Sequence, residues 1–176
     1  MKLFPRRGLI YLAAAAILGL VAMGLSSGAE FGLWQRIGAL TGTRLDLGPV
    51  DFQTLTRRAS PNDSLACPQD ACPQARADID PPVYTSSATR LKERLRAALA
   101  LAQEPRITEL AEVSDLHLRF VQRSFLMRYP DVVDVLFLPR SSGSATIAIY
   151  SRSAVGHSDL GVNRARLERW LELMSR

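Results

Sequence analysis

The chain has 176 residues, enough for one modest domain and an additional segment. Three of its 22 basic residues, Lys2, Arg6 and Arg7, precede the first acid, which leaves 19 against 17 acidic residues and a net charge of +2 for residues 30–176. This near balance, with no groove-reading motif, excludes nucleic acid as an expected partner. No motif indicates a cofactor.

The first element in chain order is an uninterrupted apolar run from Gly8 to Leu25, placed directly after the three basic residues. These 18 residues would span about 27 Å as a helix, close to the thickness of a hydrocarbon core. The length favours a retained membrane anchor over residues 1–28, and the alternative is a signal peptide cleaved after Ala29. The basic flank predicts a single pass through the inner membrane, with the rest of the chain extracytoplasmic, in the periplasm.

Three further regions follow the anchor. Residues 29–43 contain "FGLWQRIGAL" and predict a juxtamembrane helix, and residues 44–176 predict an extracytoplasmic domain. Within that domain, we expect an extended arm at Asp46–Leu55 and an irregular, proline-rich loop at 58–81.

The two cysteines of the chain, Cys67 and Cys72, lie in "ACPQDACPQ" inside the proline-rich loop. Outside the cytoplasm they are candidates for a disulfide that closes a small loop. Together with His117 and His157 they match no spacing typical of zinc ligands, so we predict no metal site.

From residue 82 onward the hydrophobic pattern is regular. A helix is predicted within 86–103, with Ser86 or Ser87 as its N-cap, and a last helix from Val162 to about Met174. Strands are predicted at 82–86, 106–113, 115–123, 130–139 and 145–152, with a hairpin turn at 140–144. This order predicts the α+β class: a two-layer sandwich of an antiparallel sheet with two packed helices, preceded by the transmembrane helix.

Strand alternation divides the predicted sheet into two faces. The face assigned to the helices carries Leu116, Leu118, Phe120, Val133, Val135, Phe137, Ile147 and Ile149. The opposite face mixes charged residues with aliphatic ones, and its candidate binding residues are Arg119, Arg123, Asp134, Tyr150 and Arg152. Asp134 needs Arg119 or Arg152 as a partner. Two interpretations stay open: a cross-strand ion-pair network under the proline-rich loop, and a groove that grips an amphiphilic anion.

The stretch "SAVGHSDLGVNRAR" connects the last strand to the last helix. Its His157, Ser158 and Asp159 are consecutive, so their side chains diverge and do not form a catalytic triad. Capping of the last helix by Ser158 or Asp159 is the favoured interpretation. The catalytic alternative is a hydrolase of an anionic substrate that uses His157 or Asp159 with Arg152.

The same stretch resembles the signature of a family, domain-of-unknown-function family 1499, whose members carry a pattern like R-S-x-S-x-V-G-Y-S-D-x-G-V-N-R-x-R. "RSFLMRYPDVVDVLF" and "RASPNDSL" resemble two further elements of this family, and the resemblance covers most of residues 48–174. The matching positions are Pro61, Asn62, Arg128, Asp131, Asp134, Arg152, Ser153, Gly156, Ser158, Asp159, Gly161, Asn163, Arg164 and Arg166. His157 stands where many relatives have tyrosine. The resemblance implies a bacterial envelope protein with relatives in plastids, and no known reaction.

Taken together, these features predict a membrane-anchored extracytoplasmic domain without catalysis. Its expected partners are the membrane, a lipid or small anionic molecule, or another envelope protein. The alternatives are the hydrolase described above and a structural subunit of a membrane complex.

Overall fold

The structure, a computed structural model, describes residues 11, 14–19, 38, 40, 45–102, 106–124 and 129–175. Most of the anchor predicted at 1–28 and of the juxtamembrane helix at 29–43 lies outside these residues, as does Arg128. Within the described part of the chain, no helix is long and apolar enough to cross a membrane.

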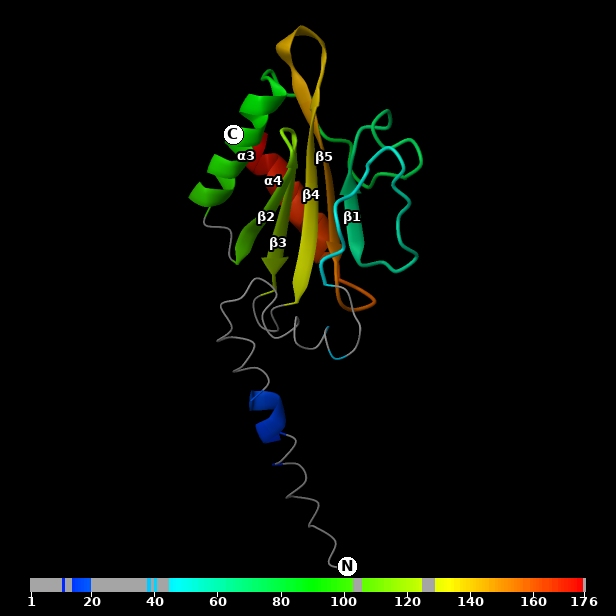
Figure 1. Ribbon diagram of the computed structural model, residues 1–176, viewed down its shortest axis with the longest axis vertical. Helices are drawn as coiled ribbons and strands as arrows, with labels where there is room; N and C mark the ends of the chain where they lie inside the picture. Colours follow the sequence, from blue (N-terminus) through cyan, green and yellow to red (C-terminus); the bar gives the residue numbers. More distant parts are fainter. Residues whose placement is uncertain are drawn as a thin grey trace, which may run out of the picture.

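One five-stranded antiparallel sheet forms the centre of the domain (Figure 1). Its strands are β1 (Asp63–Ala66), β2 (Ile107–Ser114), β3 (His117–Arg123), β4 (Pro130–Pro139) and β5 (Ala145–Ser153). Their order across the sheet is β1-β5-β4-β3-β2, so β5 and β4 are inner strands. A short 3-10 turn, η1 (Ser141–Gly143), joins β4 to β5 in the hairpin at one end of the sheet.

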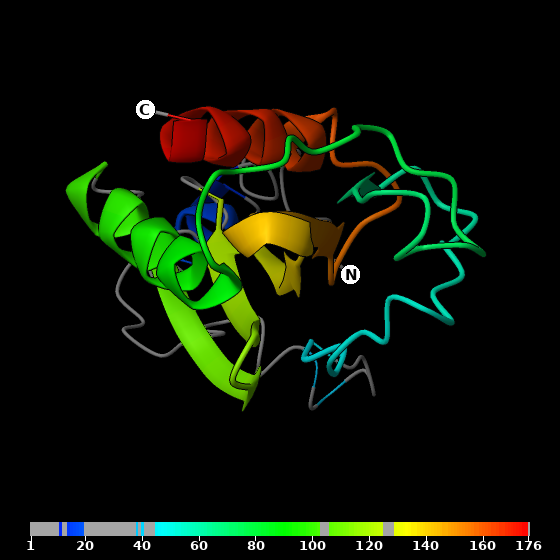
Figure 2. The same ribbon diagram turned by 90° about the horizontal axis from the view of Figure 1, so that it is seen from above.

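Two helices, α3 (Ala88–Leu101) and α4 (Val162–Ser175), cover one face of this sheet (Figure 2). The α3 helix begins after Ser87, whose side chain accepts a hydrogen bond from the Arg90 amide and so satisfies one free donor of the first turn. The prediction of an antiparallel sheet packed with two helices is therefore confirmed.

The core between sheet and helices contains the residues that the alternation assigned to this face. Seven of them are buried and Leu116 is partly buried against them. Trp170 of α4 contacts Phe120 of β3 edge to face, with ring centroids 5.6 Å apart. The apolar pattern of the last helix predicts that Val162 is buried, but it is half exposed and the buried stripe of α4 begins at Asn163.

The second face of the sheet is covered by chain between residues 45 and 80. A second hydrophobic cluster there joins Phe52, Leu55 and Leu65 to Tyr150 on β5. Cys67 and Cys72 belong to the same cluster and are joined by a disulfide, with their Cα atoms 6.2 Å apart. Strands β3, β4 and β5 are consequently buried on both faces, by helices on one side and by largely irregular chain on the other, whereas the edge strand β2 is largely exposed.

Two strand assignments differ from the sequence pattern. β1 lies inside the segment expected to be an irregular loop, where it pairs with β5 and places Leu65 opposite Tyr150. Its four residues are too few to show an alternating pattern, so only the tertiary pairing reveals it. Conversely, the expected strand at 82–86 contains only an isolated bridge between Tyr84 and Ala145.

Candidate functional site

The charged residues of the second sheet face gather around Asp134 on β4. Cross-strand pairing places Arg119 of β3 directly opposite Asp134. On β5, Asp134 is paired with Tyr150, and Arg152 lies two residues further along the strand on the same face. The Asp134 carboxylate is fully buried and lies 2.9 Å from Arg152 Nη2 and 3.4 Å from Arg119 Nε. His117 Nε2 is 3.2 Å from the same carboxylate. These four residues form the Asp134 cluster.

The predicted arm covers this cluster and hydrogen-bonds to it. The Val50 amide donates to Asp134 Oδ1 at 3.2 Å. The Gly48 carbonyl accepts from Arg152 Nη2 at 2.5 Å. Because the arm uses these donors and acceptors, the cluster binds part of its own chain.

The two arginines of the cluster are balanced by Asp134 and by Asp46 of the arm. Arg119 pairs with Asp46 of the arm as well as with Asp134, and this contact holds the pKa of the Asp46 carboxyl below its usual value. Two guanidinium groups thus face two carboxylates. Of the two interpretations left open by the sequence, this geometry is that of the ion-pair network.

Two candidate binding residues lie apart from the Asp134 carboxylate. The Tyr150 hydroxyl donates to Asp63 on β1, and burial together with this carboxylate raises the pKa of Tyr150. The Arg152 guanidinium lies over the Tyr150 ring, 5.4 Å from its centroid. Arg123 lies at the last position of β3 and lines a different space, described below.

A second buried polar network lies on the helix side of the sheet, centred on Arg166 of α4. Its guanidinium donates to Gln122 (2.6 Å), Ser151 (2.7 Å), Asn163 (2.5 Å) and Asp131 (2.6 Å). One side chain thereby connects α4 to strands β3, β4 and β5. These five residues are the Arg166 network.

Four residues of the family motif, Asn62, Ser153, Gly156 and Asn163, connect loops to this network. Asn163 Nδ2 donates to the Asn62 carbonyl at 3.0 Å and to Ser153 Oγ at 3.1 Å. Asn62 Nδ2 in turn donates to the Gly156 carbonyl at 2.7 Å. These bonds hold the segment before β1 and the loop after β5 against the start of α4, which is a structural role.

The loop after β5 caps α4, as the sequence indicated. Asp159 accepts from the Asn163 amide (2.8 Å) and from the Gly161 amide (3.1 Å), while Ser158 accepts from Leu160 (3.3 Å). Gly161 has φ +81°, a backbone angle that glycine adopts without steric cost.

The residues of the catalytic alternative are separated. Asp159 is occupied by helix amides, His157 is exposed in the loop, and Arg152 lies on the opposite sheet face in the Asp134 cluster. The residues of a catalytic site must lie within hydrogen-bond reach of one another, and His157, Asp159 and Arg152 do not form such a group.

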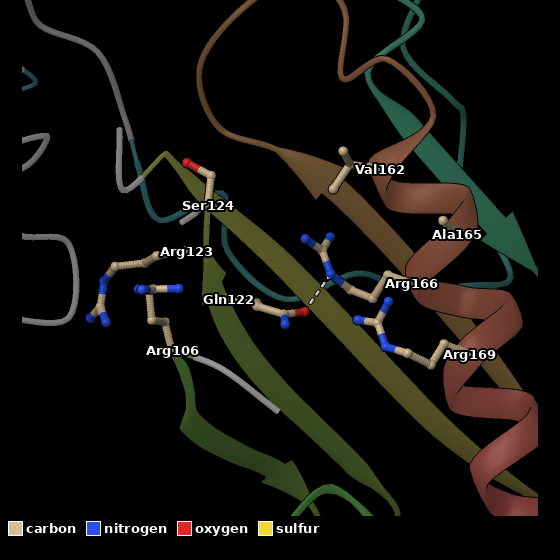
Figure 3. A pocket seen from close by; sticks show the side chains of 8 residues that line it. All are labelled: Arg106, Gln122, Arg123, Ser124, Val162, Ala165, Arg166 and Arg169. Atoms are coloured by element: carbon tan, nitrogen blue, oxygen red, sulfur yellow. Dashed lines mark hydrogen bonds between the residues drawn. The ribbon is translucent and has the colours of Figure 1, made fainter. Parts of the chain in front are cut away.

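A cavity of about 610 Å³ opens where α4 begins and β3 ends (Figure 3). It is lined by Arg106, Gln122, Arg123, Ser124, Val162, Ala165, Arg166 and Arg169. Figure 3 shows Arg166 and Arg169 reaching from α4 toward Gln122, with Arg106 on the strand side and Arg123 extending away from α4. None of its described lining residues is acidic. We call it the arginine cavity.

The sequence pattern did not identify this cavity as a site. Arg106 and Arg169 carried no motif, and Arg166 was known only from the family resemblance. One signal was present: Arg166 and Arg169 are three residues apart in a helix, so both lie on neighbouring positions of one face. Arg106 has φ 57° at the entry to β2, a conformation that periodicity does not report.

The fold and these sites define a small α+β domain in which most buried charges neutralise one another and one cavity presents several arginines. The chain belongs to the family described as Protein of unknown function (DUF1499), whose model matches residues 52–174. A search of curated proteins finds no match to it.

Proposed function

We propose that this chain is a non-catalytic binding domain for an anionic ligand, tethered to the outer side of a membrane by its N-terminal segment. The observation that carries the proposal is the arginine cavity. Its volume of about 610 Å³ is within the range of small-molecule sites.

The chemistry of the lining favours a phosphate or carboxylate group. Guanidinium groups donate parallel hydrogen bonds that match both anions. Arg166 contributes fixed geometry, because four of its five donors are held within the Arg166 network. Arg106 lies directly before β2 and Arg169 lies on α4, so the two line the cavity from opposite sides (Figure 3), and an anion bound in it has arginine on both sides.

The proposed location rests on other features. The apolar run from Gly8 to Leu25 has the length of a membrane span. The disulfide between Cys67 and Cys72 is typical of oxidising compartments outside the cytoplasm. Both support an anchored, extracytoplasmic domain.

The test is calorimetric titration of inorganic phosphate into the full chain, held in phosphatidylcholine nanodiscs. We expect the double variant Arg106→Gln/Arg169→Gln to bind phosphate at least about tenfold more weakly, because each charge-assisted hydrogen bond contributes about 1.5–3 kcal/mol. The affinity of the unsubstituted chain should also fall as ionic strength rises.

Arg164→Gln is the matched control, since Arg164 is on the same helix but pairs with Glu168 outside the cavity. This variant should bind phosphate like the unsubstituted chain. Equal phosphate affinity in the double variant and the control would contradict the proposal.

A further inference from the structure

A second cavity of about 340 Å³ adjoins the arginine cavity. Ser124 and Val162 line both spaces, so the two are neighbours across the start of α4. The remaining lining residues of the second cavity are Tyr129, Asp131, Ser153, Val155, Gly156, Ser158, Asp159 and Leu160. We call this space the loop cavity, because most of these residues belong to the loop between β5 and α4.

The loop cavity is bordered by apolar side chains that the hydrophobic core leaves out. Leu160 is 92 % exposed, Val162 is 50 % exposed and Tyr129 is 36 % exposed, and all three line this one space. Removing an apolar group from water by covering it with a ligand is favourable. Grouping of three such side chains at one cavity is therefore informative, whereas a single exposed leucine is not.

The position of Leu160 is imposed by the loop. Its φ of 54° lies in the left-handed region, which is unfavourable for a residue with a Cβ atom. The adjoining amides are held by Ser158 and Asp159, so the loop keeps Leu160 outward at the cavity. Asparagine or glycine would meet the backbone requirement more easily, and neither would supply an apolar side chain.

The two carboxylates at the loop cavity are both engaged. Asp131 pairs with Arg166 at 2.6 Å, and Asp159 accepts from the amides at the start of α4. Neither is a free negative charge directed at a ligand, so the loop cavity is suited to an apolar group beside the basic arginine cavity.

From this juxtaposition we infer that the two cavities form one site for an anionic amphiphile. Its phosphate or carboxylate head lies among Arg106, Arg166 and Arg169, and its apolar tail lies along Leu160 and Val162. This inference rests on the proposed function and adds the class of ligand. The amphiphile reaches the site either from the bilayer, as a lipid headgroup with part of its chain, or as a free molecule.

The test compares methyl phosphate with hexyl phosphate, two esters that share a head and differ in the apolar part. Both are titrated against the full chain in phosphatidylcholine nanodiscs, with empty nanodiscs as the blank for partitioning. We expect hexyl phosphate to bind at least about tenfold more tightly, because each fully buried methylene group contributes up to about fourfold in affinity.

Leu160→Asn removes the apolar contact, and asparagine tolerates the left-handed backbone, so the loop keeps its conformation. In this variant the advantage of hexyl phosphate should shrink at least about threefold, while methyl phosphate binds as before. Leu101→Asn is the matched control, since Leu101 is 84 % exposed on α3 and lines neither cavity. It should leave both affinities unchanged.

Nanodiscs that also contain phosphatidic acid distinguish the two sources. Weaker binding of hexyl phosphate in these discs would show that a bilayer headgroup enters the site, and unchanged binding would indicate a free amphiphile; both results support the inference. Equal affinity for the two esters would overturn it while the proposed function stands. Failure of both esters to bind would overturn the proposed function as well.

Discussion

Two buried aspartates of β4, Asp131 and Asp134, show how single residues are stabilised on opposite faces of the sheet. They are three residues apart, so alternation directs them to different faces. Asp134 is neutralised by arginines from neighbouring strands, and Asp131 by Arg166 from a helix. A buried carboxylate without such a partner would be strongly unfavourable, which explains why each face carries its own arginine.

Replacement of Arg166 tests the Asp131 pair. Arg166→Met leaves Asp131 buried without its cation, and we expect the free energy of unfolding to fall by about 3–5 kcal/mol. Chemical denaturation followed by circular dichroism measures this. Arg164→Met is the control, because the contacts of Arg164 with Glu168 and with the Asp78 carbonyl are exposed, and an exposed helix pair contributes about 0.5 kcal/mol or less. A similar loss in both variants would contradict the assigned role.

At the scale of elements, the irregular chain between residues 45 and 80 acts as the second cover of the sheet. The first part of the arm, residues 46–50, is held by polar contacts to the Asp134 cluster. Hydrophobic residues of the whole segment pack on β5. This segment has few of the regular hydrogen bonds that usually stabilise a layer. The Asp134 cluster and this hydrophobic packing together hold the arm against the sheet.

Replacement of Asp134 tests this dependence. Asp134→Asn keeps the shape but removes the negative charge between two arginines, so we expect the arm to detach locally. Hydrogen exchange of the Val50 amide should accelerate at least about tenfold, whereas amides of α3 should change little. Asp70→Asn is the control, because its pair with Arg140 is exposed. Unchanged protection of Val50 would rule out this role of the cluster.

At the scale of the whole molecule, the two ends of the sheet differ in character. The hairpin between β4 and β5 lies at one end, and the loop between β5 and α4 lies at the other end (Figure 1). The arginine cavity and the loop cavity are both at this second end, at the start of α4. The apolar core lies between them under the helices. Binding is therefore expected at the end with the cavities, away from the region that provides most of the hydrophobic stabilisation.

Stability of the whole domain should depend on pH in the acid range. Burial tends to raise the pKa of Asp78, but its hydrogen bonds to Arg57, Leu65 and Ser64 outweigh burial and lower that pKa below its ordinary value. A lowered carboxyl pKa contributes stability above the unfolded value, and this contribution is lost as pH falls through the folded value. We expect the free energy of unfolding to decrease from pH 5 to pH 3.

Denaturation midpoints at several pH values measure this decrease, and Asp78→Asn should make its slope shallower. The variant also weakens the hydrogen bonds that join residue 78 to Ser64 and Leu65 of β1, so it should be less stable at pH 7. An unchanged slope in the variant would mean that other carboxyls, such as Asp46, account for the acid sensitivity.

Much of the fold was accessible from periodicity. Alternation identified the longer strands and assigned the helix-facing residues correctly. The start of α3 was predicted with Ser86 or Ser87 as its N-cap, and Ser87 is the one that caps the helix. The short strand β1 was not accessible, because four residues carry no readable period and pair with β5 only through distant chain.

For the candidate site, the sequence by itself determined that Asp134 needed a cation and that Asp159 was suited to cap a helix, because these requirements are local. Only the tertiary structure decided that the Asp134 cluster binds the chain's own arm, and that Arg106 and Arg169 line the same cavity. These two residues are 63 positions apart. Side chains so distant are brought together by the packing of α4 on the sheet, and no local pattern encodes that distance.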